Sequence, residues 1–218
     1  MCFSPEADAV VGGIVIVVGV DALRHVRTPN QLPLASLPLL FGLHQVSEAF
    51  VWWGLQGNVA HAVERAALWA YLLFAFAALP VLIPVAVGLI ERSPVRRRII
   101  IGFGVLGTAV GGALLAALFR GPIHTVIDGR HIAYDVDALH FGAQLTALYV
   151  IATCGALLAC SYRDIATIGA LNLIVVPLLM GLTISGFVSL WCFWAAIVSI
   201  LIARHLRRVA TPRLPAPV

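Results

Sequence analysis

Seven long apolar stretches constrain the fold of this chain more than any other feature. A helix that crosses the roughly 30 Å hydrocarbon core of a bilayer needs about 20 mostly apolar residues. The apolar stretches cover residues 5–23, 32–55, 65–90, 99–119, 138–160, 165–183 and 186–205. They are continuous, whereas the strands of a membrane barrel alternate in segments of about ten residues. The sequence therefore predicts an all-α fold, a bundle of seven transmembrane helices.

The composition excludes the main soluble alternatives. Hydrophobic residues make up 61% of the chain and charged residues 11%, whereas a soluble domain has about 45–50% apolar and about 25% charged residues. A water-soluble enzyme and a disordered chain are both excluded on this ground. The sequence pI is near 9.2, but the arginines are placed as in a membrane protein. We expect the lipid bilayer as a partner and no nucleic acid.

The positions of the cationic residues predict the orientation. All 14 are arginines, and with seven spans only Arg65, Arg120 and Arg130 fall on one side of the membrane. Cytoplasmic loops carry the excess of positive charge. We therefore expect an outer N-terminus, a cytoplasmic C-terminus and a multi-pass location in the plasma (inner) membrane. The other eleven are Arg24, Arg27, Arg92, Arg96, Arg97, Arg98, Arg163, Arg204, Arg207, Arg208 and Arg213.

The chain reads as a single domain with short ends. Residues 1–210 are predicted to form one seven-helix membrane domain, and the Pro-containing residues 211–218 are predicted to be a flexible tail. The first apolar stretch has Glu6 and Asp8 on its N-terminal flank, where a signal peptide carries positive charge. We therefore expect this stretch to remain as the first helix.

The long outer loop, residues 120–137, predicts a short β-hairpin between the fourth and fifth helices. Asp128-Gly129 lies between alternating apolar residues, which is a strong hairpin signal. With these two residues as the turn, Val126 would face His131. His124 and His131 would then point to solvent. The opposite face would lie on the bundle through Ile123, Thr125, Ile127, Ile132 and Tyr134.

The most costly polar residues lie in the second apolar stretch. A charged side chain at the centre of a membrane helix costs about 2.5–3.5 kcal/mol on insertion scales. His44 lies about halfway along residues 32–55, and Glu48 follows one turn closer to the outside. Residues four apart share one helical face, and Ser47 sits beside them. These side chains are therefore expected to face the bundle interior.

Three roles would explain this pair of residues. Imidazole and carboxylate groups can ligate a metal ion, they can relay protons, or they can only hydrogen-bond other helices. A metal needs more than two ligands, and further donors are predicted on the outer side. We hypothesise a site for one transition-metal ion (zinc, copper or iron) with the ligands Cys2, His44, Glu48 and His140. Supporting polar groups would be Glu6, Ser47 and Gln144.

Tryptophans cluster near the predicted outer ends of the second and seventh helices. This placement is typical of an interfacial aromatic belt. The alternative is an aromatic-lined pocket, to which Trp52 would belong. The residues are Trp52, Trp53, Trp191 and Trp194.

Three classes of function stay open. A metal-binding membrane protein, with or without enzyme activity, predicts converging ligands in an outward-facing pocket. A non-catalytic scaffold or sensor predicts that the buried polar residues only lock helices together. A small-solute or proton-coupled transporter predicts a polar path through the inner half, where the sequence offers few polar residues. No catalytic residue can be assigned. A retinal protein is excluded because the chain has no Schiff-base lysine.

Three segments of the chain are distinctive: Met1-Cys2-Phe3-Ser4, Leu23-Arg24-His25-Val26, and Pro38 to Gln45 with Glu48 and Trp52. In these segments the chain resembles an uncharacterised family of bacterial multi-pass membrane proteins, labelled a domain of unknown function, whose members open with Met-Cys-Phe-Ser. The resemblance implies a multi-pass membrane protein and brings no activity. Ser47, His44 and Glu48 also superficially resemble the seven-helix membrane zinc hydrolases of the ceramidase type. Those proteins carry a His-x-x-x-His pair on the last helix, which residues 185–205 lack.

Overall fold

A computed structural model describes residues 4–129, 131–136, 142–182 and 187–210. Helices make up most of it, with one two-stranded sheet. The helices are α1 (Pro5–Arg24), α2 (Leu32–Leu55), α3 (His61–Leu72), α4 (Leu79–Ile90), α5 (Pro94–Arg120), α6 (Gly142–Leu158), α7 (Arg163–Leu182) and α8 (Phe187–Ala210). A 3-10 turn, η1 (Pro29–Gln31), precedes α2, and a π-helical segment, η2 (Leu73–Ala78), joins α3 to α4. The strands are β1 (Ile123–Asp128) and β2 (His131–Val136).

Each predicted apolar stretch contains a helix, so the prediction of a mostly helical chain is confirmed. Within the described ranges, three continuous helical stretches are long and apolar enough to cross a membrane. They are Pro29–Leu55, His61–Ile90 and Pro94–Arg120. The count of seven crossings and the orientation stay predictions. Residues 211–218, the predicted tail, lie outside the described residues.

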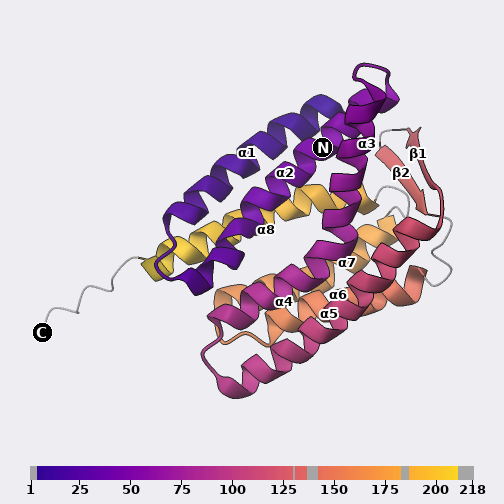
Figure 1. Cartoon of the computed structure of the whole chain (residues 1–218). Helices are drawn as coiled ribbons and strands as arrows, with labels where there is room; N and C mark the ends of the chain where they lie inside the picture. Colours follow the sequence, from indigo (N-terminus) through magenta and orange to yellow (C-terminus); the bar gives the residue numbers. More distant parts are fainter. Residues whose placement is uncertain (1–3, 130, 137–141, 183–186, 211–218) are drawn as a thin grey trace, which may run out of the picture.

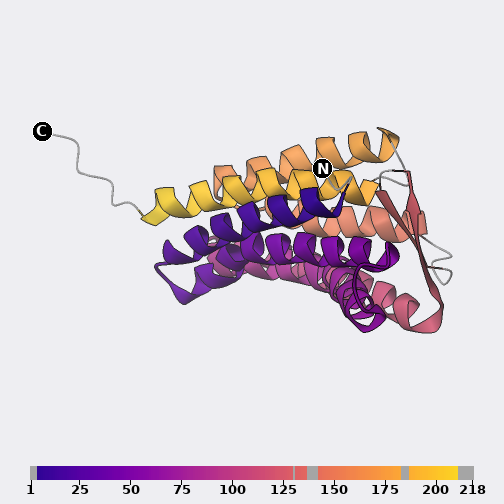
Figure 2. The same cartoon turned by 90° about the horizontal axis from the view of Figure 1, so that it is seen from above.

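The helices lie side by side, with the β-hairpin at one end of the bundle and the last turn of α8 at the other (Figures 1 and 2). We call these the hairpin end and the C-terminal end. Neighbours in sequence pack together, and α8 returns to lie against α1 and α2. The main hydrophobic core draws buried side chains from every helix except α3. Smaller apolar clusters at the hairpin end join α2, α3 and α5 to β2.

Small residues let α1 and α2 approach very closely. A Cβ atom added at Gly19 would lie 2.3 Å from the backbone nitrogen of Leu39, and one added at Gly12 would lie 2.8 Å from Val46. Gly42 of α2 faces the backbone of α1 in the same way. Such a tight antiparallel pair is typical of small-residue packing between membrane helices. It fixes which residues of α1 lie level with the polar residues of α2.

The π-helical segment η2 has a local cause in Pro80. The backbone N–H of Leu79 donates to the carbonyl of Phe74, five residues back. The next residue, Pro80, has no N–H for the carbonyl of Ala75. The hydroxyl of Tyr149, on α6, donates to that carbonyl at 2.9 Å. The freed backbone group is therefore satisfied by a neighbouring helix, as a low-dielectric interior requires.

The hairpin forms where the sequence predicts it, but its register differs. Asp128 pairs with His131 and Val126 with Ala133, so the predicted pairing of Val126 with His131 is wrong. The reason is that the turn begins at Gly129, which adopts a left-handed φ of 60°, as the first central residue of both hairpin turn types, I′ and II′, requires. The shift moves the pairing by two positions, which leaves the faces unchanged. Ile132 is fully buried on the bundle, as expected.

The histidines of the hairpin differ from each other. His124 is exposed, as predicted. The side chain of His131 is only 16% exposed, and its Nε2 atom lies 3.7 Å from Oδ2 of Asp128. The prediction that both histidines point to solvent is therefore wrong for His131.

The C-terminal end is held by ion pairs to the last helix. Nε of Arg207 donates to Oδ2 of Asp21 on α1 at 2.8 Å. Nδ1 of His205 lies 3.3 Å from Oδ2 of Asp164 on α7, and Arg208 contacts the other oxygen of the same carboxylate at 3.3 Å. These contacts seat the end of α8 between α1 and α7.

Candidate functional site

The polar residues predicted to be costly are buried together on α2. His44 is 8% exposed, Gln45 is buried and Glu48 is fully buried. His44, Glu48 and Trp52 follow one another at four-residue spacing, so they share one face of the helix. Partners on both sides cover α2, since it packs against α1, α3, α4 and α8. The prediction that His44 and Glu48 face the interior is confirmed.

The imidazole of His44 lies in an aromatic setting. Its ring stacks on Tyr71 of α3, with centroids 4.0 Å apart and planes 10° apart, and lies 5.0 Å from the ring of Phe74. Tyr71 in turn stacks on Tyr134 of β2 at 5.0 Å. Three rings thus form a column from α2 through α3 to the hairpin. Within the part of the chain that the structure describes, Nδ1 of His44 has no hydrogen-bond partner.

A second fully buried carboxylate, Asp8, belongs to the same region and was missed in the sequence. Gly19 faces Leu39, and Gly12 faces Val46. Continuing this antiparallel register by one turn places Asp8 level with Glu48 to Trp52. A signal was present: Asp8 continues the stripe of α1 that carries Gly12, Val15 and Gly19, which is the packed face. Its place near the start of the first apolar stretch had indicated a flank instead.

The other predicted site residues are placed differently. Glu6 and Gln144 are exposed, so the structure does not bring them to the buried residues. The hydroxyl of Ser47 donates to the carbonyl of Leu43 in its own helix at 3.0 Å. Cys2 and His140, the remaining predicted ligands, lie outside the described residues.

Trp52 is buried, which contradicts its assignment to an interfacial belt. It packs with Val51 and with Ile132 of the hairpin. Trp194, assigned to the same belt, donates its indole N–H to Oδ1 of Asn172 between α8 and α7. A tryptophan near a helix end marks an interface only when no other element covers it. The hairpin covers Trp52, and the sequence around Trp52 does not indicate this contact.

A mostly apolar cavity of about 200 Å³ lies beside Tyr71. Tyr71 and Tyr134 line it, together with Thr146, Tyr149 and Thr153 of α6. Tyr71 thus both stacks on His44 and borders the cavity.

The metal-ligating capacity of the described residues is limited to pairs. His44 and Glu48 supply one imidazole and one carboxylate, both suitable for zinc, copper or iron. No group of three or more His, Cys, Asp or Glu side chains able to hold a metal occurs within residues 4–129, 131–136, 142–182 and 187–210. A complete coordination sphere therefore needs donors from beyond these ranges, and the predicted ones are Cys2 and His140.

A second polar centre, not anticipated from the sequence, lies at the C-terminal end. Glu91, between α4 and α5, is buried. Its Oε1 accepts from the backbone N–H of Ser93 and from the hydroxyl of Ser161, both at 2.7 Å. Its Oε2 accepts from the backbone N–H of Ser161 at 2.6 Å. Burial alone would raise the pKa of Glu91, but these hydrogen bonds outweigh it and hold the pKa below its ordinary value.

Comparison with known proteins bears on the whole chain. A family model described as a family of unknown function (DUF6629) matches residues 1–216. The chain belongs to this family. The match extends over every helix and both polar centres, and it assigns neither of them a role. Comparisons with curated proteins and with solved structures each returned no match.

Proposed function

We propose that this member of the family is a seven-span plasma-membrane protein that holds a transition-metal ion in the outer half of its bundle. The outer half is the hairpin end. The ligands are His44 and Glu48 of α2, completed by Cys2 and His140. One observation carries the proposal: an imidazole and a carboxylate are buried on one face of α2, and Nδ1 of His44 has no hydrogen-bond partner among the described residues.

Energetics supports a specific role for these side chains. An unsatisfied buried polar atom costs about 1–3 kcal/mol, and intramembrane ionisable residues commonly mark functional sites. A ligated ion would use the free imidazole nitrogen and neutralise carboxylate charge at once. Bound there, it would supply a Lewis-acid centre. The stacked ring of Tyr71 fixes the plane of the imidazole, which orients its nitrogens.

The test is the metal content of the purified full chain, measured by inductively coupled plasma mass spectrometry on protein isolated without a histidine tag. We expect about one zinc, copper or iron per chain in the wild type. His44→Ala and the near-isosteric Glu48→Gln should lose most of it. The matched control is His61→Ala, because the His61 side chain is 73% exposed and its contacts among the described residues, to Glu64 and Arg65, are within its own helix.

Two results would overturn the metal proposal. One is a wild type without bound metal, and the other is unchanged metal in a folded His44→Ala variant. Gel filtration reports whether each variant is folded. Cys2→Ser provides a further arm, since it changes a predicted ligand without changing any residue of α2.

A second candidate function, a non-catalytic sensor or scaffold, is favoured by the ring column His44–Tyr71–Tyr134. The column connects a hairpin at the membrane surface to the middle of α2. A ligand that displaced the hairpin would move Tyr134, and through it the packing around His44. This function requires no metal, so the metal measurement distinguishes the two candidates.

A further inference from the structure

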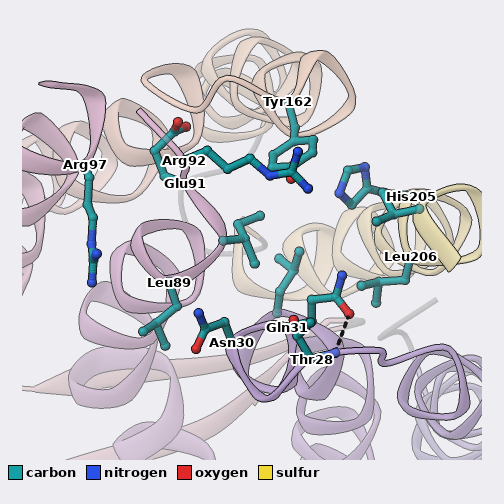
Figure 3. A pocket seen from close by; sticks show the side chains of 13 residues that line it. Thr28, Asn30, Gln31, Leu89, Glu91, Arg92, Arg97, Tyr162, His205 and Leu206 are labelled. Carbon is teal, nitrogen blue, oxygen red and sulfur yellow. Dashed lines mark hydrogen bonds between the residues drawn. The ribbon is translucent and has the colours of Figure 1, made fainter. Parts of the chain in front are cut away.

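A polar cavity of about 300 Å³ opens at the C-terminal end, far from the His44 centre (Figure 3). Its walls come from η1, the α4–α5 connection, the α6–α7 connection and α8. The guanidinium of Arg92 lies 5.8 Å from the centroid of the Tyr162 ring, which holds it at the cavity. Arg97 borders the other side. The remaining polar lining is Thr28, Asn30, Gln31, Glu91 and His205.

The charge of this cavity is positive. Among the residues that the structure describes, neither Arg92 nor Arg97 forms an ion pair. Glu91 is the one carboxylate in the described lining, and its oxygens accept hydrogen bonds from Ser93 and Ser161. Figure 3 shows this carboxylate turned away from the Arg92 guanidinium. Two guanidinium groups therefore border a space with no opposing charge directed into it.

An apolar groove of about 630 Å³ continues from the cavity along the surface between α4 and α5. The two spaces share Leu89 and Arg97. Gly88 and Gly104 leave the groove hollow because they have no side chain to fill it. Its rim carries exposed apolar side chains, Val85, Ile101 and Val105. Arg97 therefore lies where the cationic cavity meets the apolar groove.

We propose that cavity and groove together bind one phospholipid with an anionic headgroup. The phosphate would pair with Arg97, which lines both spaces, because a guanidinium group pairs with phosphate through two parallel hydrogen bonds. An acyl chain would fill the groove over Gly88 and Gly104. Basic pockets between membrane helices on the cytoplasmic side bind anionic headgroups in this way. The site is independent of the proposed metal centre, which lies at the other end of the bundle.

The first arm of the test addresses the headgroup. The purified full chain in detergent is titrated with dioctanoyl phosphatidylglycerol, with dioctanoyl phosphatidylcholine and with inorganic phosphate, and binding is read by native mass spectrometry. One arginine near an anionic lipid contributes about fivefold in affinity. We expect phosphatidylglycerol to bind more tightly than phosphatidylcholine, and Arg97→Gln to weaken phosphatidylglycerol about fivefold.

The matched control for this arm is Arg98→Gln. It removes the same charge from the next position of α5, which lines neither space. We expect less than about a twofold change. Equal effects of Arg97→Gln and Arg98→Gln, or equal binding of the two lipids, would show general surface attraction and overturn the proposal.

The second arm addresses the acyl chain and separates a lipid from a free anion. Gly104→Leu fills the groove, whereas Gly102→Leu in the same helix points into open space, with no atom within 4 Å of a Cβ there. Gly104→Leu should weaken phosphatidylglycerol binding about fivefold or more, which corresponds to the loss of at least about one buried methylene, and Gly102→Leu should not. Unchanged lipid binding in Gly104→Leu, or inorganic phosphate binding as tightly as the lipid, would contradict the proposal.

Discussion

Glu91 shows what a single buried carboxylate does for this fold. It joins the α4–α5 connection to Ser161, in the α6–α7 connection, through both of its oxygens. The neighbouring Arg96 adds hydrogen bonds to the carbonyls of Ala159 and Cys160, at 3.4 and 3.2 Å. Two connections that are distant in sequence are therefore held together at the C-terminal end. The carboxylate form is the one that accepts all three hydrogen bonds.

The stability that Glu91 contributes is expected to depend on pH. Because folding lowers its pKa, this stability is fully present above its ordinary value of 4.5 and is lost as the pH falls through the lower folded value. Glu91→Gln should cost about 2 kcal/mol at neutral pH, the scale of a hydrogen bond to a charged group. The check is the thermal unfolding midpoint in detergent between pH 7 and pH 3. The deficit of the variant should shrink in acid, and the exposed Glu6→Gln should differ little from the wild type.

At the scale of single residues, the sequence predicted burial correctly where the free-energy cost of exposing a polar side chain to lipid determines it. His44 and Glu48 lie in the middle of an apolar stretch, so their burial could be predicted from the free-energy cost of exposing them to lipid. Asp8 lies one turn from the start of α1, where an acidic residue is also favourable when it is exposed to water. Only the stripe of packed residues through Gly12 and Gly19 indicates that Asp8 is buried and not exposed. The role of Glu91 depends on Ser161, 70 residues away, and no local pattern contains that pairing.

At the scale of elements, the contact between α4 and α5 depends on Gly107. A Cβ at this position would lie 1.9 Å from the carbonyl oxygen of Pro80. A carbonyl is backbone and cannot move without displacing α4. Gly107 and Gly111 form a small-xxx-small pair, which permits close helix packing, and Gly111 faces Ala77 of the π-helical segment.

Gly107→Ala should therefore destabilise the protein by about 1–3 kcal/mol, as overpacking does. Gly102→Ala is the matched control in the same helix, because a Cβ there meets no atom within 4 Å. It should be neutral or stabilise by about 0.4–1 kcal/mol, since alanine restricts the unfolded chain. Unfolding midpoints of both variants decide the matter. Equal destabilisation by the two substitutions would refute the contact.

Helices and hairpin were predictable because periodicity and apolar length are local properties of the sequence. The π-helical segment was not, because Pro80 signals only a disturbance of the helix. Its form depends on Tyr149, which supplies the missing donor from α6. The predicted strand register was wrong because Asp128-Gly129 admits more than one turn position, and the local pattern does not distinguish between them.

At the scale of the whole molecule, the two ends of the bundle differ in chemistry. The hairpin end holds the His44 centre beneath Trp52 and the hairpin. The C-terminal end holds Asp21–Arg207, the Glu91 centre and the cationic cavity. Arginine excess at this end is the basis for placing it in the cytoplasm. The proposed metal and lipid sites are thus assigned to opposite faces of one membrane.

The measurement that tests this account most directly is the sidedness of the two ends. Single cysteines are placed at His61, the first residue of α3, and at Arg27, between α1 and α2, in chains whose native cysteines are replaced by serine. Both positions are exposed. Intact cells are then treated with a membrane-impermeant maleimide. The account predicts labelling of His61→Cys in intact cells and of Arg27→Cys only after permeabilisation. Labelling of both from the same side, or the reverse pattern, would contradict it.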